Sequence, residues 1–200
     1  GTGVLKLTSS VVSNLCVVVG DPARAKAISE LLEDSIRVCK KREYYIYTGL
    51  YKGVKVTVAS HGVGASGANV LFSELIQIGV DVIIRAGTCG TYGPYPRGSH
   101  VVASSAVRND GASDKLIPLS YPASAHFEVT YLLQKIAKDY AKTQENPSPL
   151  AVGICNTVAN LYGGLIVPPN KMWQQANVIG EDMETSSLFT LGGIHNIKTG

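Results

Sequence analysis

Short apolar runs alternate along this chain with segments of helical spacing, and this alternation limits the possible folds more than any other feature. Buried strands are expected at residues 15–19, 44–51, 54–59, 80–86, 101–107 and 150–154, with a last strand beginning at residues 178 and 179. Helices are expected over residues 23–32, 70–78, 129–141 and 184–191. Because strands and helices alternate, the sequence predicts an α/β protein with a mostly parallel or mixed sheet.

The overall composition is that of a globular protein. Of the 200 residues, 45% are hydrophobic and 16% are charged, and this length suffices for one domain with a sizeable core. The formal charge of +3 comes without a block of Lys and Arg, which weighs against a nucleic-acid partner. No apolar run reaches the roughly 18 residues of a membrane span, and no signal-peptide pattern is present. We therefore expect a cytoplasmic protein with neither a nucleic-acid nor a membrane partner.

The cysteines do not form a metal-binding pattern. The chain has Cys16, Cys39, Cys89 and Cys155, with no CxxC pair and no histidine at metal-ligand spacing. Cys16 and Cys155 lie inside apolar runs and are expected to be buried free thiols. This usage favours a reducing compartment and predicts no metal site.

A GxGxxG pattern, formed by Gly62, Gly64 and Gly67, raises the question of dinucleotide binding. A Rossmann site needs an acidic residue at the end of the next strand. The candidate, Asp81, precedes its strand, and Arg85 stands at the end instead. An NAD-dependent dehydrogenase is therefore disfavoured, and the glycines are expected to permit a tight turn and close helix packing.

Arginines follow or border several predicted strand ends, where ligands gather in α/β sheets. They are Arg24, Arg42 and Arg85. A phosphate needs forked donors and backbone N–H groups, and Gly20 and Thr88 could supply the latter. A solvated surface charge is the alternative for Arg42, which follows two lysines. Arg85 follows an apolar strand, where burial without an anion would be costly.

An acidic cluster, Glu181-Asp182-Met183-Glu184, lies where a predicted strand becomes a helix. A carboxylate at this point could accept hydrogen bonds from both hydroxyls of a ribose. The alternative for Glu184 is favourable interaction with the helix N-terminus. Met183 could pack against a sugar or fill the core.

Six motifs in sequence order give the chain a resemblance to the purine nucleoside/uridine phosphorylase family, closest in the middle segment to uridine phosphorylase. The motifs are Gly20-Asp-Pro-Ala-Arg24, Arg42-Glu-Tyr, Ser60-His-Gly-Val-Gly64 with Glu74-Leu75, Arg85-Ala-Gly-Thr-Cys-Gly90, Val107-Arg-Asn-Asp-Gly-Ala-Ser113 and Asp182-Met-Glu184. The resemblance implies a single domain over residues 1–200. It would have three α/β/α layers around a central mixed sheet and lack the family's last strand and helix.

The resemblance also implies a phosphate site. In this sequence it would consist of Gly20, Arg24, Arg85 and Thr88, with Arg42 reaching into the site of a neighbouring subunit. Sites shared in this way imply a homodimer or a larger homo-oligomer.

The nucleoside would lie beside the phosphate. The resemblance places Met183 and Glu184 on the ribose, and Cys89, Gly90 and Tyr162 near the base. Gly62 and Gly64 would turn the chain tightly beside the nucleoside.

The implied reaction is phosphorolysis of a nucleoside to a free base and (deoxy)ribose 1-phosphate. Inorganic phosphate would be the co-substrate, with no metal or organic cofactor. Arg85 and Glu184 are the expected catalytic residues. Phosphate would act as nucleophile and as charge partner of an oxocarbenium-like transition state, in a position that the arginines set.

The sequence features disagree about which base the substrate carries. Uridine is favoured by the middle segment, yet Leu165 and Val167 stand near the positions where uridine enzymes carry polar base-reading residues. A purine nucleoside phosphorylase acting on inosine or guanosine is the alternative, and its base-protonating Asp would follow Gly200. Val4 replaces a family histidine that contacts the ribose 5′-hydroxyl of a neighbour. A nucleosidase would not need the arginines, and nothing in the residues favours a non-catalytic nucleoside-binding protein.

Overall fold

The computed structural model describes residues 1–200, which divide into two compact units. The first unit comprises Gly1–Gly87 and Ile194–Thr199, and the second comprises Thr88–Gly193 and Gly200. Each unit has a mixed sheet with helices packed on it, which confirms the expected α/β class. The expectation of one domain over residues 1–200 stays a prediction. No helix has both the length and the apolar character needed to cross a membrane.

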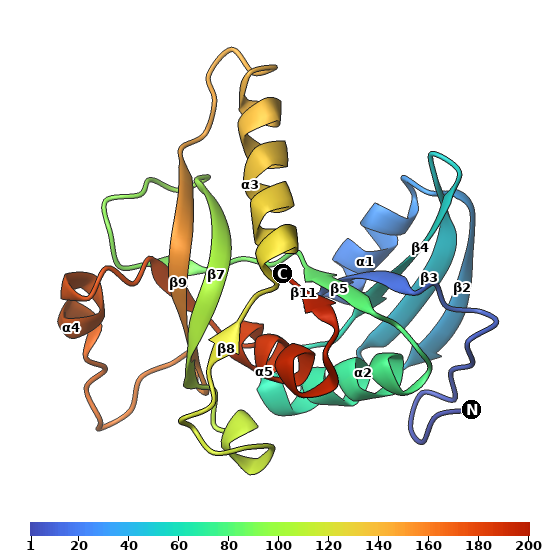
Figure 1. The fold of residues 1–200 in the computed structure, drawn as a ribbon, viewed down its shortest axis with the longest axis horizontal. Coiled ribbons are helices and arrows are strands. Elements are labelled where there is room, and N and C mark those ends of the chain that lie inside the picture. Colours follow the sequence, from blue (N-terminus) through green and yellow to red (C-terminus); the bar gives the residue numbers. More distant parts are fainter. The chain divides into compact units, whose positions relative to one another are not determined.

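The first unit contains a six-stranded sheet in the order β11-β5-β1-β4-β3-β2 (Figure 1). Strands β11, β5, β1 and β4 are parallel to one another, while β3 pairs antiparallel with both β4 and β2. The elements are β1 (Leu15–Val19), α1 (Pro22–Ser29), β2 (Glu33–Lys41), β3 (Tyr44–Tyr51), β4 (Val54–Ser60), α2 (Ala65–Gln77), β5 (Val82–Arg85) and β11 (Lys198–Thr199). Part of its core consists of Val19, Ala25, Tyr47 and Val58, between α1 and the sheet.

The strand β2 was not expected from the sequence. Of its nine residues, EDSIRVCKK, only Cys39 is buried, so the sequence has no alternation of apolar and polar residues that would predict a strand. Charged side chains are typical of an edge strand, where they discourage pairing with other chains. Pairing with β3 supplies the hydrogen bonds that the local sequence does not predict.

The glycine-rich segment makes a tight turn, as expected. Gly62 and Gly64 have φ angles of 76° and 91°, which favour glycine strongly. The helix α2 begins at Ala65, earlier than the expected residue 70, because its first turn buries small side chains. Its end is a Schellman motif in which Gly79 has a φ angle of 98° and donates to Ile76.

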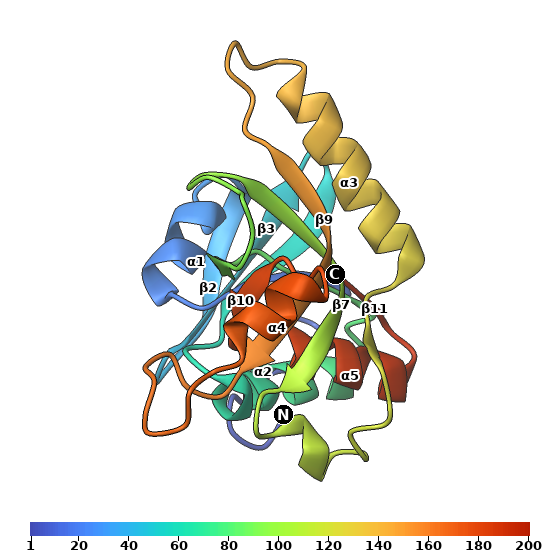
Figure 2. The ribbon, with the colours of Figure 1, turned by 90° about the vertical axis from the view of Figure 1, so that its left-hand side faces the viewer.

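The second unit contains a five-stranded sheet in the order β6-β10-β9-β7-β8. The central strands β10, β9 and β7 are parallel, and the two outer strands are antiparallel to their neighbours. Helix α3 lies along β7 and β9 in both views (Figure 1 and Figure 2). The elements are β6 (Gly90–Thr91), β7 (His100–Asn109), a 3-10 turn (Ser113–Lys115), β8 (Ala123–Ser124), α3 (Phe127–Ala141), β9 (Leu150–Val158), α4 (Asn170–Gln175), β10 (Gly180–Asp182) and α5 (Thr185–His195).

The remaining expectations differ from the structure mainly in length. The strand β9 continues to Val158, and the last expected strand begins at Gly180. The elements β6, β8, β11 and α4 were missed because each is too short to carry a periodic pattern. All four cysteines are free thiols, with Cys16 and Cys155 buried as expected.

Candidate functional site

The carboxyl ends of three parallel strands meet at one edge of the sheet in the first unit. In register, Val19 of β1 pairs with Ser60 of β4, and Val18 pairs with Arg85 of β5. The Gly62 N–H donates to the Gly20 carbonyl at 2.9 Å, which joins the ends of β1 and β4. Two predicted phosphate residues, Gly20 and Arg85, therefore lie at the same sheet edge.

Arg24 reaches this edge on helix α1, which begins two residues after Gly20. The carboxylate of Asp21 accepts a hydrogen bond from the Ala23 N–H at 2.8 Å and caps the helix. Pro22 stands at the first position of the helix, where its missing N–H costs nothing. The cap therefore holds the half-buried Arg24 in the first turn, close to the end of β1.

Arg42 lies in the turn between β2 and β3, at the same edge. The start of β3 is tied to the end of β4, since Ser60 Oγ donates to the Glu43 carbonyl and accepts from the Tyr45 N–H. The Arg42 side chain is 76% exposed, and its Nε lies 3.7 Å from Glu43 Oε2. Such an exposed ion pair constrains the guanidinium little. The turn thus presents Arg42 to solvent.

Gly87 governs the position of the Arg85 guanidinium. A Cβ atom built on Gly87 would lie 2.6 Å from Arg85 Cζ, which is closer than real atoms approach. The half-buried Arg85 side chain therefore folds back over Gly87, and a methyl group at this residue would displace the guanidinium. The glycine after the arginine is part of what places this charge.

Glu74, a residue of the quoted motifs, fixes the start of the chain. Its buried carboxylate accepts hydrogen bonds from the Thr2 hydroxyl and from the Val4 and Leu5 N–H groups. Burial acts to raise the pKa of Glu74, but these hydrogen bonds outweigh it and hold the pKa below its usual range. Val4, the residue expected at the position of the family histidine, is held through its backbone while its side chain stays half exposed.

In the second unit, strand ends converge on the start of α5. Asp182, the last residue of β10, accepts hydrogen bonds from the N–H groups of Glu184 and Thr185 at 3.0 and 2.8 Å. Thr157 of β9 donates its hydroxyl to Asp182 at 2.7 Å and accepts the Ser186 N–H at 2.9 Å. These side chains satisfy the first N–H groups of α5, which the helix itself leaves unpaired. They hold the backbone of Glu184, whose side chain is buried.

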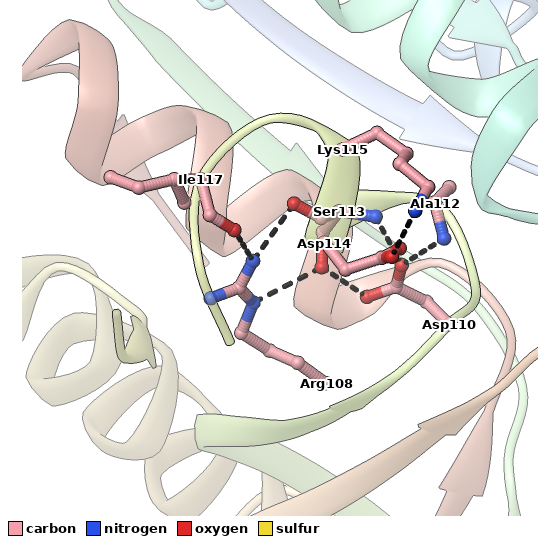
Figure 3. A network of polar contacts seen from close by, with 7 residues as sticks. All are labelled: Arg108, Asp110, Ala112, Ser113, Asp114, Lys115 and Ile117. Carbon is pink, nitrogen blue, oxygen red and sulfur yellow. Dashed lines mark hydrogen bonds and ion pairs between the residues drawn. The ribbon is translucent and has the colours of Figure 1, made fainter. Parts of the chain in front are cut away.

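A second carboxylate supports α5 from β7. Asp110, just beyond β7, accepts hydrogen bonds from the Ser186 hydroxyl, from the Ser113 hydroxyl and N–H, and from the Ala112 N–H. Burial acts to raise the pKa of Asp110, but the Ser113 N–H and the two serine hydroxyls hold it below its usual range. Asp110 is therefore ionised at neutral pH. Figure 3 shows its contacts with the segment that follows β7.

Arg108 anchors that segment and is not available to bind an anion. Its Nε donates to the Ser113 hydroxyl, and its Nη2 donates to the carbonyls of Ser113 and Ile117 at 2.8 and 2.9 Å (Figure 3). Its Nη1 donates to the carbonyls of Pro118 and Tyr121 at 2.6 and 2.7 Å. The guanidinium has no donor left over, so Arg108 shapes the loop that carries Ser113.

The expected base residues lie in two different environments. Cys89 and Gly90 are exposed, and Gly90 belongs to β6, opposite Glu181 of β10. Tyr162 is 85% exposed and makes no hydrogen bond or ring contact. It lies in the loop between β9 and α4, in which Leu165 and Val167 are also exposed.

The expected site residues are thus shared between the two units. Gly20, Arg24, Arg42 and Arg85 gather at one sheet edge of the first unit, while Thr88, Cys89, Gly90, Met183 and Glu184 lie in the second. The supporting groups Thr157 and Asp110 were missed by sequence reasoning. Each is a polar residue at the end of an apolar strand, and this position could have marked it as a site residue, because strand ends in parallel sheets meet at one edge.

Comparisons with known proteins give a consistent result. The sequence model described as "Phosphorylase superfamily" matches residues 14–200. The chain is 34% identical to purine nucleoside phosphorylase of Plasmodium vivax, over 98% of this chain and 79% of that protein. It is 32% identical to uridine phosphorylase of Haemophilus influenzae, over 94% of this chain and 78% of that protein.

Solved structures agree with the sequence comparisons. The crystal structure of uridine phosphorylase from Vibrio fischeri matches with a TM-score of 0.87 and 29% identity, over 96% of this chain and 79% of that one. This similarity confirms the nucleoside phosphorylase fold that the motifs predicted. The chain therefore belongs to the phosphorylase superfamily and, within it, to the nucleoside phosphorylases, which are pentosyltransferases.

Proposed function

We propose that this protein cleaves the N-glycosidic bond of uridine with inorganic phosphate, giving uracil and ribose 1-phosphate. The observation that carries the proposal is the gathering of Gly20, Arg24 and Arg85 at one sheet edge. Two guanidinium groups beside a strand end and a helix N-terminus form a set of donors suited to a phosphate dianion. A nucleosidase would have no use for this set, because water would replace phosphate.

Phosphate would be held through several kinds of donor. Arg24 and Arg85 would supply charge and forked N–H groups, and the backbone of Gly20 would add a further donor. Orientation of the nucleophile is the main contribution of these residues to the rate. No metal or organic cofactor is part of the proposal, because phosphate itself is the second substrate.

Glu184 would hold the ribose. Its backbone is fixed by Asp182 and Thr157, so a carboxylate at this point would accept hydrogen bonds from the sugar hydroxyls with little loss of side-chain entropy. Met183, half-buried beside it, would pack against the sugar ring. In the transition state the C1′–N bond breaks, its electron pair leaves with the base, and a phosphate oxygen bonds to C1′. The arginine-bound phosphate stabilises the positive charge that develops on the sugar.

A purine nucleoside is the second candidate substrate. The observation in its favour is that Leu165 and Val167, near the expected positions of the base-reading residues, have side chains that cannot hydrogen-bond to a uracil edge. A buried uracil group left without a partner would cost about 1–3 kcal/mol. The similarity to a purine nucleoside phosphorylase of Plasmodium vivax supports the same alternative.

The proposed site includes a second copy of the chain. Arg42 is exposed on its turn and would complete the phosphate site of a neighbouring subunit, in a homodimer or a larger homo-oligomer.

The test is release of base from uridine and from inosine, each with and without phosphate, by the unaltered protein and by Arg85→Ala. We expect release that requires phosphate, faster from uridine, and its loss in the variant with little change in melting temperature. Release without phosphate would indicate a nucleosidase. Undiminished activity of Arg85→Ala would refute the assignment of the phosphate site.

A further inference from the structure

A chain of hydrogen bonds in the second unit ends on the carboxylate of Glu181. Asn109 donates through Nδ2 to Asn156 Oδ1 at 2.9 Å, and Asn156 donates through Nδ2 to the Tyr92 hydroxyl at 3.1 Å. Tyr92 in turn donates to Glu181 Oε2 at 2.6 Å. The members come from β7, from β9, from the residue after β6 and from β10. Residues up to 89 positions apart in the sequence are therefore joined in one row of hydrogen bonds, whose last donor is the Tyr92 hydroxyl.

The hydrogen bonds in this row all run in the same direction. Each side chain donates toward Glu181, and the carboxylate can only accept. Burial, together with the hydrogen bond to Glu181, raises the pKa of the Tyr92 phenol to about 12, so this hydroxyl remains a donor throughout the neutral range. Hydrogen bonds in such a row strengthen one another. The arrangement holds the half-buried Glu181 side chain in one orientation.

Only one of the two carboxylate oxygens is used. Glu181 Oε2 accepts a hydrogen bond from the Tyr92 hydroxyl, whereas Oε1 accepts no hydrogen bond from any group of the protein. A carboxylate that is fixed on one side and open on the other has capacity for a further donor.

The position of the open oxygen is informative. Glu181 pairs with Gly90 across β10 and β6, and a Cβ built on Gly90 would lie 3.6 Å from Glu181 Cγ. Gly90 is one of the residues that the family resemblance places near the base, and Glu181 precedes Met183 by two positions. The carboxylate thus lies beside the backbone that would face the base.

We propose that Glu181, held by Tyr92 and Asn156, accepts a hydrogen bond from the ring N–H of the base and so selects oxo-nucleosides over amino-nucleosides. This inference rests on the proposed function. Uracil carries a ring N–H at N3, and hypoxanthine and guanine carry one at N1. Cytosine and adenine present a lone pair at the corresponding atoms, which a carboxylate repels. The selection therefore applies equally to a pyrimidine and to a purine substrate.

The experiment measures selectivity in addition to rate. The values of kcat/KM are determined with phosphate for uridine against cytidine and for inosine against adenosine, and the ratio is compared between variants. Glu181→Gln keeps the shape and can still accept from Tyr92, but its amide also donates to a ring lone pair. We expect the oxo-to-amino ratio for the better-used pair to fall by roughly 10- to 100-fold, which corresponds to the loss of one charged hydrogen bond.

Two further variants complete the test. Tyr92→Phe removes the donor that orients Glu181, and a smaller fall in the ratio is expected. Glu145→Gln, at an exposed position in the same unit, makes the same chemical change and should leave the ratio unchanged. Melting temperatures of all variants distinguish a change in selectivity from a loss of folded protein.

The possible failures are distinguishable. If the unaltered protein releases base only with phosphate, but its ratio is unchanged in Glu181→Gln, the inference about Glu181 is wrong while the proposed function stands. An unaltered protein without preference for the oxo-nucleoside would also overturn it. If no nucleoside is phosphorolysed at all, the proposed function fails, and the inference fails with it.

Discussion

At the scale of single residues, Gly87 offers a direct test of how Arg85 is placed. Gly87→Ala would drive the guanidinium from its position, because the new methyl group would overlap Arg85 Cζ. The side chain is flexible, so it can move at little cost in stability. We expect the KM for phosphate to rise about 10-fold or more, which corresponds to the weakening of a charged hydrogen bond.

The matched control for Gly87→Ala is Gly164→Ala, which adds the same methyl group where no atom lies within 4 Å. Its KM for phosphate should equal that of the unaltered protein. Equal values for both variants would show that Gly87 does not position Arg85.

Asp110 is the residue whose ionisation is expected to affect stability. The pKa of Asp110 is held below the usual value of about 3.9. Its hydrogen bonds therefore contribute fully to the free energy of unfolding above that pH, and this contribution is lost as the pH falls through the folded-state pKa. Asp110→Asn should lower the free energy of unfolding by about 1–3 kcal/mol at pH 7. Denaturant titrations at several pH values should show this difference shrinking in acid. Asp34→Asn, at an exposed position, is the control, and a pH-independent deficit in Asp110→Asn would contradict the assignment.

At the scale of elements, the start of α5 depends on strands distant in sequence. Thr157→Val would remove the hydroxyl that Asp182 and the Ser186 N–H both use, leaving buried polar groups unpaired. We expect a loss of about 1–3 kcal/mol in the free energy of unfolding and a fall in kcat. The KM for phosphate should change little, because the arginines lie on other elements. Thr143→Val, whose hydroxyl is exposed, should change neither kcat nor stability. A shifted phosphate KM with unchanged kcat would be the contrary outcome.

Elements also explain which features the sequence could predict. The strands β1, β3 and β4 were predicted to within a residue, because buried strands require apolar runs. The strand β2 was missed because its stability comes from pairing with β3 rather than from its own residues. In the same way, Arg85 and Glu184 stood out at strand ends, whereas Thr157, Asp110 and Tyr92 act through partners that only the folded chain brings near. Local pattern predicts elements, and long-range hydrogen bonds decide the details of a site.

At the scale of the whole molecule, the proposed contribution of Arg42 to a neighbouring subunit has a testable consequence. Arg42→Ala and Arg85→Ala should each be inactive when expressed alone. In a mixed dimer, however, one of the two sites would combine an intact Arg85 with an intact Arg42 from the other copy. Co-expression of the two variants should therefore restore about a quarter of the sites, since about half of the dimers are mixed and each has one complete site.

The opposite arrangement predicts a different result. If Arg42 served the site of its own chain, every site in the mixture would lack either Arg42 or Arg85, and activity would not return. The exposed side chain of Arg42 is compatible with transfer across an interface, because nothing in its own chain holds the guanidinium firmly. Phosphate-dependent turnover of the purified mixed protein, compared with each variant alone, therefore decides whether the catalytic unit is one chain or two.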